Sequence, residues 1–138
     1  MKTKQFSGSC LCGEVAYQFT GAPRVFQYCH CSRCQKFTGS AHASNIIVDP
    51  VQFEWIKGEQ SVGRFEHPQA KHFATSFCQH CGSSLPWLTK SGRAVVIPAG
   101  TLDDDPESRP IHNIYYADKA SWYKDVSALI KYDALPIK

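Results

Sequence analysis

Seven cysteines in three short clusters are the feature that most limits how this 138-residue chain can fold. The clusters are Cys10-Leu11-Cys12, Cys29-His30-Cys31-Ser32-Arg33-Cys34 and Cys78-Gln79-His80-Cys81. Sulfurs bound about 2.3 Å from a tetrahedral zinc ion lie about 3.8 Å from one another. Two cysteines separated by one or two residues reach that spacing where the backbone turns sharply, and Gly13 and Gly82 follow two of the clusters. We therefore predict that the cysteines are metal ligands.

The clusters divide most simply into a closed set and an open set. The first and third clusters each supply a pair, and two distant pairs together complete a tetrahedron. This closed structural zinc site would consist of Cys10, Cys12, Cys78 and Cys81. The middle cluster supplies three ligands, which are Cys29, Cys31 and Cys34. Three protein ligands with one open position are typical of a catalytic zinc, so we expect two zinc ions per chain.

Two other interpretations of the cysteines stay open. A histidine of the same chain could close the second site, and the candidates are His42, His67, His72 and His112. The Cys-x-x-Cys motifs could instead be redox pairs, although such pairs usually begin a helix within a βαβ unit. A zinc deaminase is excluded because it requires a His-x-Glu motif, whereas His42 is followed by alanine and serine.

Alternating apolar residues between glycine and proline turns predict a mainly β fold with little helix. Val15, Tyr17 and Phe19 should share one face of a strand, and similar patterns occur at 26–28, 51–55, 73–77 and 93–97. One helical turn is expected over 32–37, ending at Gly39, and residues 102–110 should form a polar loop. The segment 120–132 could be a short helix or a last strand. We expect one zinc-binding domain over residues 1–138.

Composition and charge limit the location and the partners of the chain. No segment approaches the roughly 18 apolar residues of a membrane helix, and residues 1–6 lack the apolar core of a signal peptide. We therefore expect a cytoplasmic protein without a membrane partner, in a compartment that disfavours disulfides. The formal net charge is +3. Seven thiolates would subtract seven charges and two zinc ions would add four, which brings the net charge to zero. A chain without excess positive charge is not expected to bind nucleic acid.

An open site with three thiolates favours a soft fourth ligand. Three thiolates make the zinc a weaker Lewis acid than three neutral histidines would, and a poorer source of hydroxide. A substrate thiol bound there would have a lowered pKa and could attack a nearby carbonyl carbon as a thiolate. The ligands Cys29, Cys31 and Cys34 therefore predict an enzyme that makes or breaks a carbon–sulfur bond.

Four stretches of the sequence match the pattern of a known family. They are residues 8–13 (GSCLCG), 29–36 (CHCSRCQK), 77–83 (FCQHCGS), and 99–103 (AGTLD) followed by 110–114 (PIHNI). From about residue 5 to 132 the chain resembles the glutathione-dependent formaldehyde-activating enzyme family, which also includes centromere protein V. The resemblance implies a β-tent fold of small antiparallel sheets clasped by zinc, with one structural zinc and one zinc open to substrate.

The resemblance also implies a function and its partners. It predicts a carbon–sulfur lyase that joins glutathione and formaldehyde, or a related aldehyde, in a thiol–aldehyde adduct. Arg33 and Lys36 could then meet the carboxylates of glutathione. His42 could carry a proton, and His112 could orient a ligand through a hydrogen bond. The alternative is a zinc-stabilised binding module without catalytic activity, which predicts a closed second site and a basic face.

Overall fold

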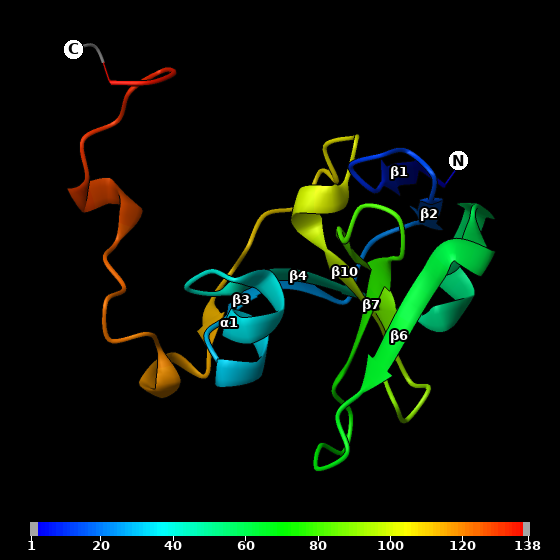
Figure 1. The fold of residues 1–138 in the computed structure, drawn as a ribbon. Coiled ribbons are helices and arrows are strands. Elements are labelled where there is room, and N and C mark those ends of the chain that lie inside the picture. The colour runs from blue at the N-terminus through cyan, green and yellow to red at the C-terminus, as the bar shows by residue number, and fades with distance from the viewer. Residues whose placement is uncertain (1–2, 137–138) are drawn as a thin grey trace.

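The computed structural model describes residues 3–136, so the two ends of the predicted 1–138 domain, residues 1–2 and 137–138, lie outside the described residues. Short strands dominate it, as Figure 1 shows. The strands are β1 (Gln5–Ser9), β2 (Ala16–Thr20), β3 (Val25–Cys29), β4 (Ala43–Val48), β5 (Phe53–Lys57), β6 (Val62–Glu66), β7 (Ala74–Cys78), β8 (Ser84–Leu85), β9 (Trp87–Leu88), β10 (Val95–Pro98) and β11 (Asn113–Ile114). The prediction of a mainly β fold is confirmed.

Helical structure is limited to short pieces within residues 3–136. The α-helix is α1 (Ser32–Thr38), and it ends at Gly39 in the left-handed conformation, as the sequence predicted. The 3-10 turns are η1 (Pro50–Gln52), η2 (Glu59–Ser61), η3 (Ala99–Thr101), η4 (Tyr116–Asp118) and η5 (Val126–Ala128). None of these described helices is both long and apolar enough to cross a membrane.

The strands form three small sheets. Their orders are β1-β2-β5, β11-β3-β4-β10-β9 and β6-β7-β8. Neighbouring strands are antiparallel, with the exception of β11, which pairs in parallel with β3. These small antiparallel sheets agree with the predicted fold class.

The main core lies between the first two sheets. Val15, Tyr17 and Phe19 are fully buried, which confirms the face that their alternation predicted. Its largest cluster contains Phe6, Tyr17, Phe19, Phe26, Ile46, Val48, Val95 and Ile97. Each such side chain contributes about 1.5–3 kcal/mol to folding when it leaves water, so this cluster provides the frame that holds the loops.

Two predicted elements are wrong. Val51 does not share a strand with Phe53 and Trp55, because it lies in η1 and is 94% exposed. Pro50 begins that turn. The Asp49 amide donates to Gln52 Oε1 at 2.8 Å and the Gln52 amide donates to the Asp49 carbonyl at 2.9 Å, and these bonds override the alternating pattern.

Residues 120–132 form neither a helix of useful length nor a strand. They contain only η5, and Figure 1 shows this part of the chain leading away from the sheets, in orange to red. Val126 and Ile130 are 65% and 81% exposed. An apolar face with nothing to pack against cannot stabilise so short a helix, since isolated helices of this length are marginal in water.

Candidate metal centres and the cavity beside them

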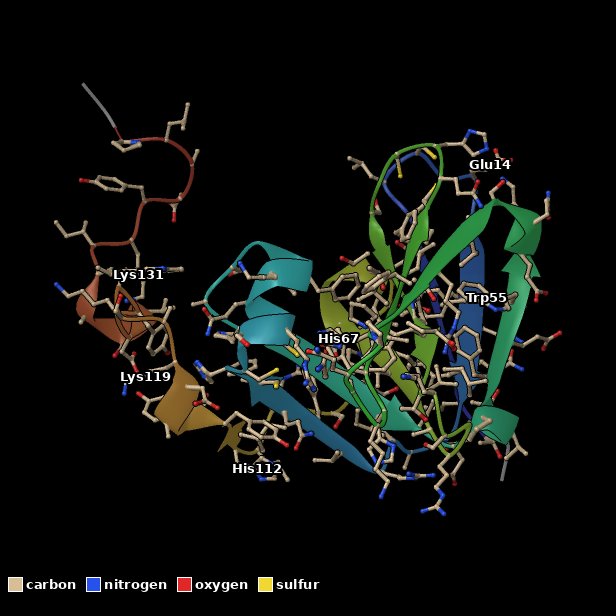
Figure 2. The ribbon with its side chains drawn as sticks, turned by 60° about the horizontal axis from the view of Figure 1, so that its bottom comes forward. Glu14, Trp55, His67, His112, Lys119 and Lys131 are labelled. Carbon is tan, nitrogen blue, oxygen red and sulfur yellow. The ribbon has the colours of Figure 1, made fainter. Side chains whose placement is uncertain are left out.

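The seven thiols gather in two separate groups. Figure 2 shows their yellow sulfur atoms near the labelled Glu14 and, apart from these, beside α1. The four-thiol group consists of Cys10, Cys12, Cys78 and Cys81, and the three-thiol group consists of Cys29, Cys31 and Cys34. Within each group all sulfurs lie within 4.8 Å of one another, and all seven cysteines are free thiols. This is the grouping that the spacing predicted.

Two turns of similar build form the four-thiol group. The amide of Cys10 donates to the carbonyl of Val15 at 3.0 Å, and the amide of Cys78 donates to the carbonyl of Ser83 at 3.0 Å. Gly13 and Gly82 adopt φ angles of 79° and 75°, which closes each turn without a side-chain clash. The β1–β2 and β7–β8 hairpins thus present their sulfurs to one point.

Further contacts lock these two turns together. The Leu11 amide donates to Ser83 Oγ at 2.9 Å, and Ser83 Oγ lies 3.2 Å from Cys81 Sγ. Within the first turn, the sulfur of Cys10 accepts from the Val15 amide at 3.3 Å, which fixes the position of that sulfur. Residues far apart in sequence are therefore held at the spacing that a shared ion requires.

The three-thiol group is built by the end of a strand and the start of a helix. Cys29 ends β3, Cys31 is the N-cap of α1, and Cys34 lies in the first turn of α1. The Cys34 amide donates to Cys31 Sγ at 3.4 Å, which caps the helix with a sulfur. Cys29 and Cys34 are 4% exposed, whereas Cys31 is partly exposed.

The loop between these ligands is braced by β11 and by the chain that follows it. Gln35 Nε2 donates to the carbonyls of His30 at 2.7 Å and of Asp118 at 3.1 Å. His30 is fully buried, and its Nε2 lies 2.8 Å from Asn113 Oδ1. The His30 amide also donates to the carbonyl of Ile114 at 3.0 Å. These bonds fix the backbone of the loop that carries the three sulfurs.

The crowding of the thiols changes their acidity. Hydrogen bonds from Cys29, and next from Cys34, lower the pKa of Cys31 to about 2. The same close packing, with Cys29 as the main cause, raises the pKa of Cys34. In the four-thiol group, the hydrogen bond from Ser83 lowers the pKa of Cys81 to about 5. Within each group the crowding therefore lowers the pKa of some thiols and raises that of others, and a divalent cation would allow every member to be a thiolate.

The distances between sulfurs fit zinc. Cys12 Sγ lies 3.6 Å from Cys10 Sγ and 3.8 Å from Cys78 Sγ. The edge of a tetrahedral zinc–thiolate site is about 3.8 Å. The four-thiol group can therefore complete a tetrahedron, and the three-thiol group can provide three of its corners.

A cavity of about 740 Å³, which we call the cysteine cavity, lies beside the three-thiol group. Its wall includes all three cysteines of that group, and it also includes Gln27, Ser32, Arg33, Asn45, Lys71, His72, Phe73, Trp87, Val96, Ile114, Tyr115 and Asp118. The volume is typical of a small-molecule site, and charged residues of both signs, Arg33, Lys71 and Asp118, line the same cavity as the sulfurs.

The four histidines considered as a fourth ligand do not join the three-thiol group, because no histidine nitrogen of residues 3–136 lies within 4.8 Å of all three sulfurs. The ring of His42 stacks on Tyr28 at 4.3 Å. His72 lines the cysteine cavity, and its Nδ1 lies 3.1 Å from Ser91 Oγ. His67 lines a second cavity, and His112, labelled in Figure 2, bonds to another side chain.

The remaining predicted residues separate into those near the sulfurs and those at a distance. Arg33 lines the cysteine cavity, whereas Lys36 lines only the second cavity. His112 Nε2 lies 2.8 Å from Gln27 Oε1, so His112 reaches the cysteine cavity through Gln27. His42 is absent from the residues that line either cavity.

Several residues that line the cysteine cavity were not predicted from the sequence. Gln27 could have been found, because it lies two residues before Cys29 on β3 and therefore shares its face. Asn45 pairs with Gln27 across β3 and β4, and that register could not be read from the sequence. Lys71 reaches the cavity from a loop and Asp118 from η4, and no local pattern marks either residue.

Comparisons with known proteins agree with this arrangement. The family model described as glutathione-dependent formaldehyde-activating enzyme matches residues 5–118. Among solved structures, the chain is similar to the crystal structure of a Rhodobacter sphaeroides protein, with a TM-score of 0.58 and 16% sequence identity over 78% of this chain and 98% of that chain. At this identity the likeness concerns the fold alone. The comparison with curated proteins found no match.

Proposed function

This chain belongs to the glutathione-dependent formaldehyde-activating enzyme family, and we propose that it is a carbon–sulfur lyase that forms or cleaves a thiol–aldehyde adduct. The thiol is glutathione, and the aldehyde is formaldehyde or a relative of it. One observation carries the proposal. The three-thiol group faces a cavity, and no fourth thiol, histidine or carboxylate within residues 3–136 lies within 4.8 Å of all its sulfurs.

We assign zinc to both groups of thiols, and we take residues 1–138 as one cytoplasmic domain with the β-tent fold. The structural ion would be held by Cys10, Cys12, Cys78 and Cys81. The second ion would be held by Cys29, Cys31 and Cys34. An ion held by these three thiolates would leave one position open, and there it would lower the pKa of a substrate thiol.

The charged residues of the cysteine cavity suit glutathione. Arg33 and Lys71 line it and can each bind one carboxylate of the tripeptide. Asp118 lines the same wall and can bind its ammonium group. These contacts would hold the thiol of glutathione close to the three sulfurs and exclude a thiol that lacks the charged ends.

The reaction is a proton-balanced addition without oxidation or reduction. A bond forms between the thiol sulfur and the carbonyl carbon, the sulfur–hydrogen bond and the π bond of the carbonyl break, and the carbonyl oxygen gains the proton. We assign this proton transfer to His72, because it lines the cavity beside the cysteines and histidine is the commonest general acid or base. The reverse reaction uses the same groups in the opposite order.

Exchange between glutathione, formaldehyde and their adduct tests the proposal directly. NMR would follow the exchange with and without protein that metal analysis has shown to contain two zinc ions. We expect the protein to accelerate exchange above the spontaneous rate. Absence of acceleration with both ions present would contradict the proposed lyase activity and favour a zinc-stabilised binding module without catalytic activity.

A further inference from the structure

A second cavity, the phenylalanine groove, adjoins the cysteine cavity. Its volume is about 720 Å³, and it lies between α1 and the β6–β7 pair, near the labelled His67 in Figure 2. Its aromatic wall consists of Phe37, Phe65, Phe73 and Phe77. The two cavities share Ser32, Arg33 and Phe73, so one ligand could extend from the cysteines into the groove.

The strand register places the rings of Phe65 and Phe77 on one face, where both are partly exposed to solvent. Phe65 pairs with Thr75, and Gly63 pairs with Phe77, so both rings lie on the same face of the β6–β7 pair. Gly63 makes room for its partner, because a Cβ atom there would lie 2.5 Å from the Phe77 ring. Phe65 remains 53% exposed and Phe77 37% exposed. An apolar ligand that covered these rings would remove their surface from water, which is favourable.

Both cavities have many apolar side chains in their walls, and they differ in their charged residues. The cysteine cavity carries Arg33, Lys71 and Asp118, which suit a zwitterionic thiol such as glutathione. The groove has four phenylalanines, and its charged side chains, Arg33 and Lys36, come from α1. Formaldehyde has one carbon atom and would leave this groove empty.

We infer that the aldehyde substrate of this protein carries an apolar substituent, which binds in the phenylalanine groove while the thiol lies in the cysteine cavity. This inference rests on the proposed function and narrows its substrate class. The reaction keeps the same balance, because the thiol adds to the carbonyl carbon and its proton passes to the carbonyl oxygen. The product is a hemithioacetal whose alkyl or aryl group lies against the rings of Phe65 and Phe77.

A comparison of aldehydes tests the inference on the zinc-loaded protein. Glutathione would be offered formaldehyde, acetaldehyde or hexanal, and adduct formation would be followed by NMR. We expect kcat/KM for hexanal to exceed that for acetaldehyde by at least about tenfold, because the additional methylene groups are buried. Values within twofold, together with clear acceleration for formaldehyde, would overturn the inference and leave the proposed function intact. No acceleration for any aldehyde would overturn both.

A substitution in the groove provides the second measurement. Phe65→Ser should lower the hexanal-to-acetaldehyde ratio of kcat/KM roughly fivefold, since a half-exposed ring is lost. Phe65→Leu should keep most of that ratio. The matched control is Ile111→Ser, since Ile111 is 70% exposed and lines neither cavity. An unchanged ratio in folded Phe65→Ser protein, with folding verified by thermal unfolding, would overturn the inference.

Discussion

The two groups of thiols differ in how far apart their members lie along the chain. Cys12 and Cys78 are 66 residues apart and belong to different hairpins. The three-thiol group spans six consecutive residues from the end of β3 to the first turn of α1. A link between distant residues restricts the unfolded chain strongly, whereas a local link restricts it little. An ion in the first group should therefore stabilise the fold, and an ion in the second should serve chemistry.

Loss of one sulfur from the four-thiol group should have the largest effect. Cys78 is 1% exposed, and Cys78→Ala should unfold the domain, because structural zinc supplies about 10–16 kcal/mol to small domains that depend on it. Circular dichroism and thermal unfolding would measure the loss. A cooperative transition within about 5 °C of the unsubstituted protein would contradict the structural role of this group.

The matched change in the three-thiol group should spare the fold and abolish activity. Cys31 is the partly exposed member, and its side chain faces the cysteine cavity. Cys31→Ala should lower kcat/KM for adduct formation by about 100-fold or more, with Tm shifted by only about 4 °C. The same two measurements, rate and Tm, serve both cysteine variants. If both variants unfolded alike, the division between a structural and a chemical group would be wrong.

The grouping of the cysteines was predictable because metal chemistry fixes distances between sulfurs whatever the fold. The buried face of Val15, Tyr17 and Phe19 was predictable because side chains alternate along any strand. The wall of the cysteine cavity was not predictable, since Asn45 enters it through the register of β3 with β4. Asp118 enters at the end of η4, more than 80 residues along the chain from the cysteines of the same cavity.

Removal of a charge from the cysteine cavity should have a smaller effect than loss of a ligand. Arg33→Ala should raise KM for glutathione roughly tenfold and change kcat less, because a carboxylate loses a charge-assisted hydrogen bond. Lys131→Ala is the control, since Lys131 lies in the segment that leads away from the sheets, as Figure 2 shows. Equal KM values for glutathione in the two variants would show that Arg33 does not bind glutathione.

The smallest effect concerns two glycines, Gly82 in the turn of the four-thiol group and Gly39 at the C-terminal end of α1. Gly82 and Gly39 have φ angles of 75° and 64°, and an added Cβ at either position would meet no atom within 4 Å. Each alanine substitution should therefore cost only the strain of the left-handed conformation, about 1–2 kcal/mol, or several degrees in Tm.

The chelator concentration that unfolds the protein should distinguish the two variants. Gly82→Ala should lower the chelator concentration that unfolds the protein, because it strains the turn that carries Cys78 and Cys81. Gly39→Ala should leave that concentration nearly unchanged after correction for its own Tm, because α1 carries no ligand of the four-thiol group. Substitution of Gly82 by asparagine, which tolerates this conformation, should restore most of the loss. Identical chelator curves for the two alanine variants would mean that strain spreads equally to both groups, and the local independence of the two centres would have to be abandoned.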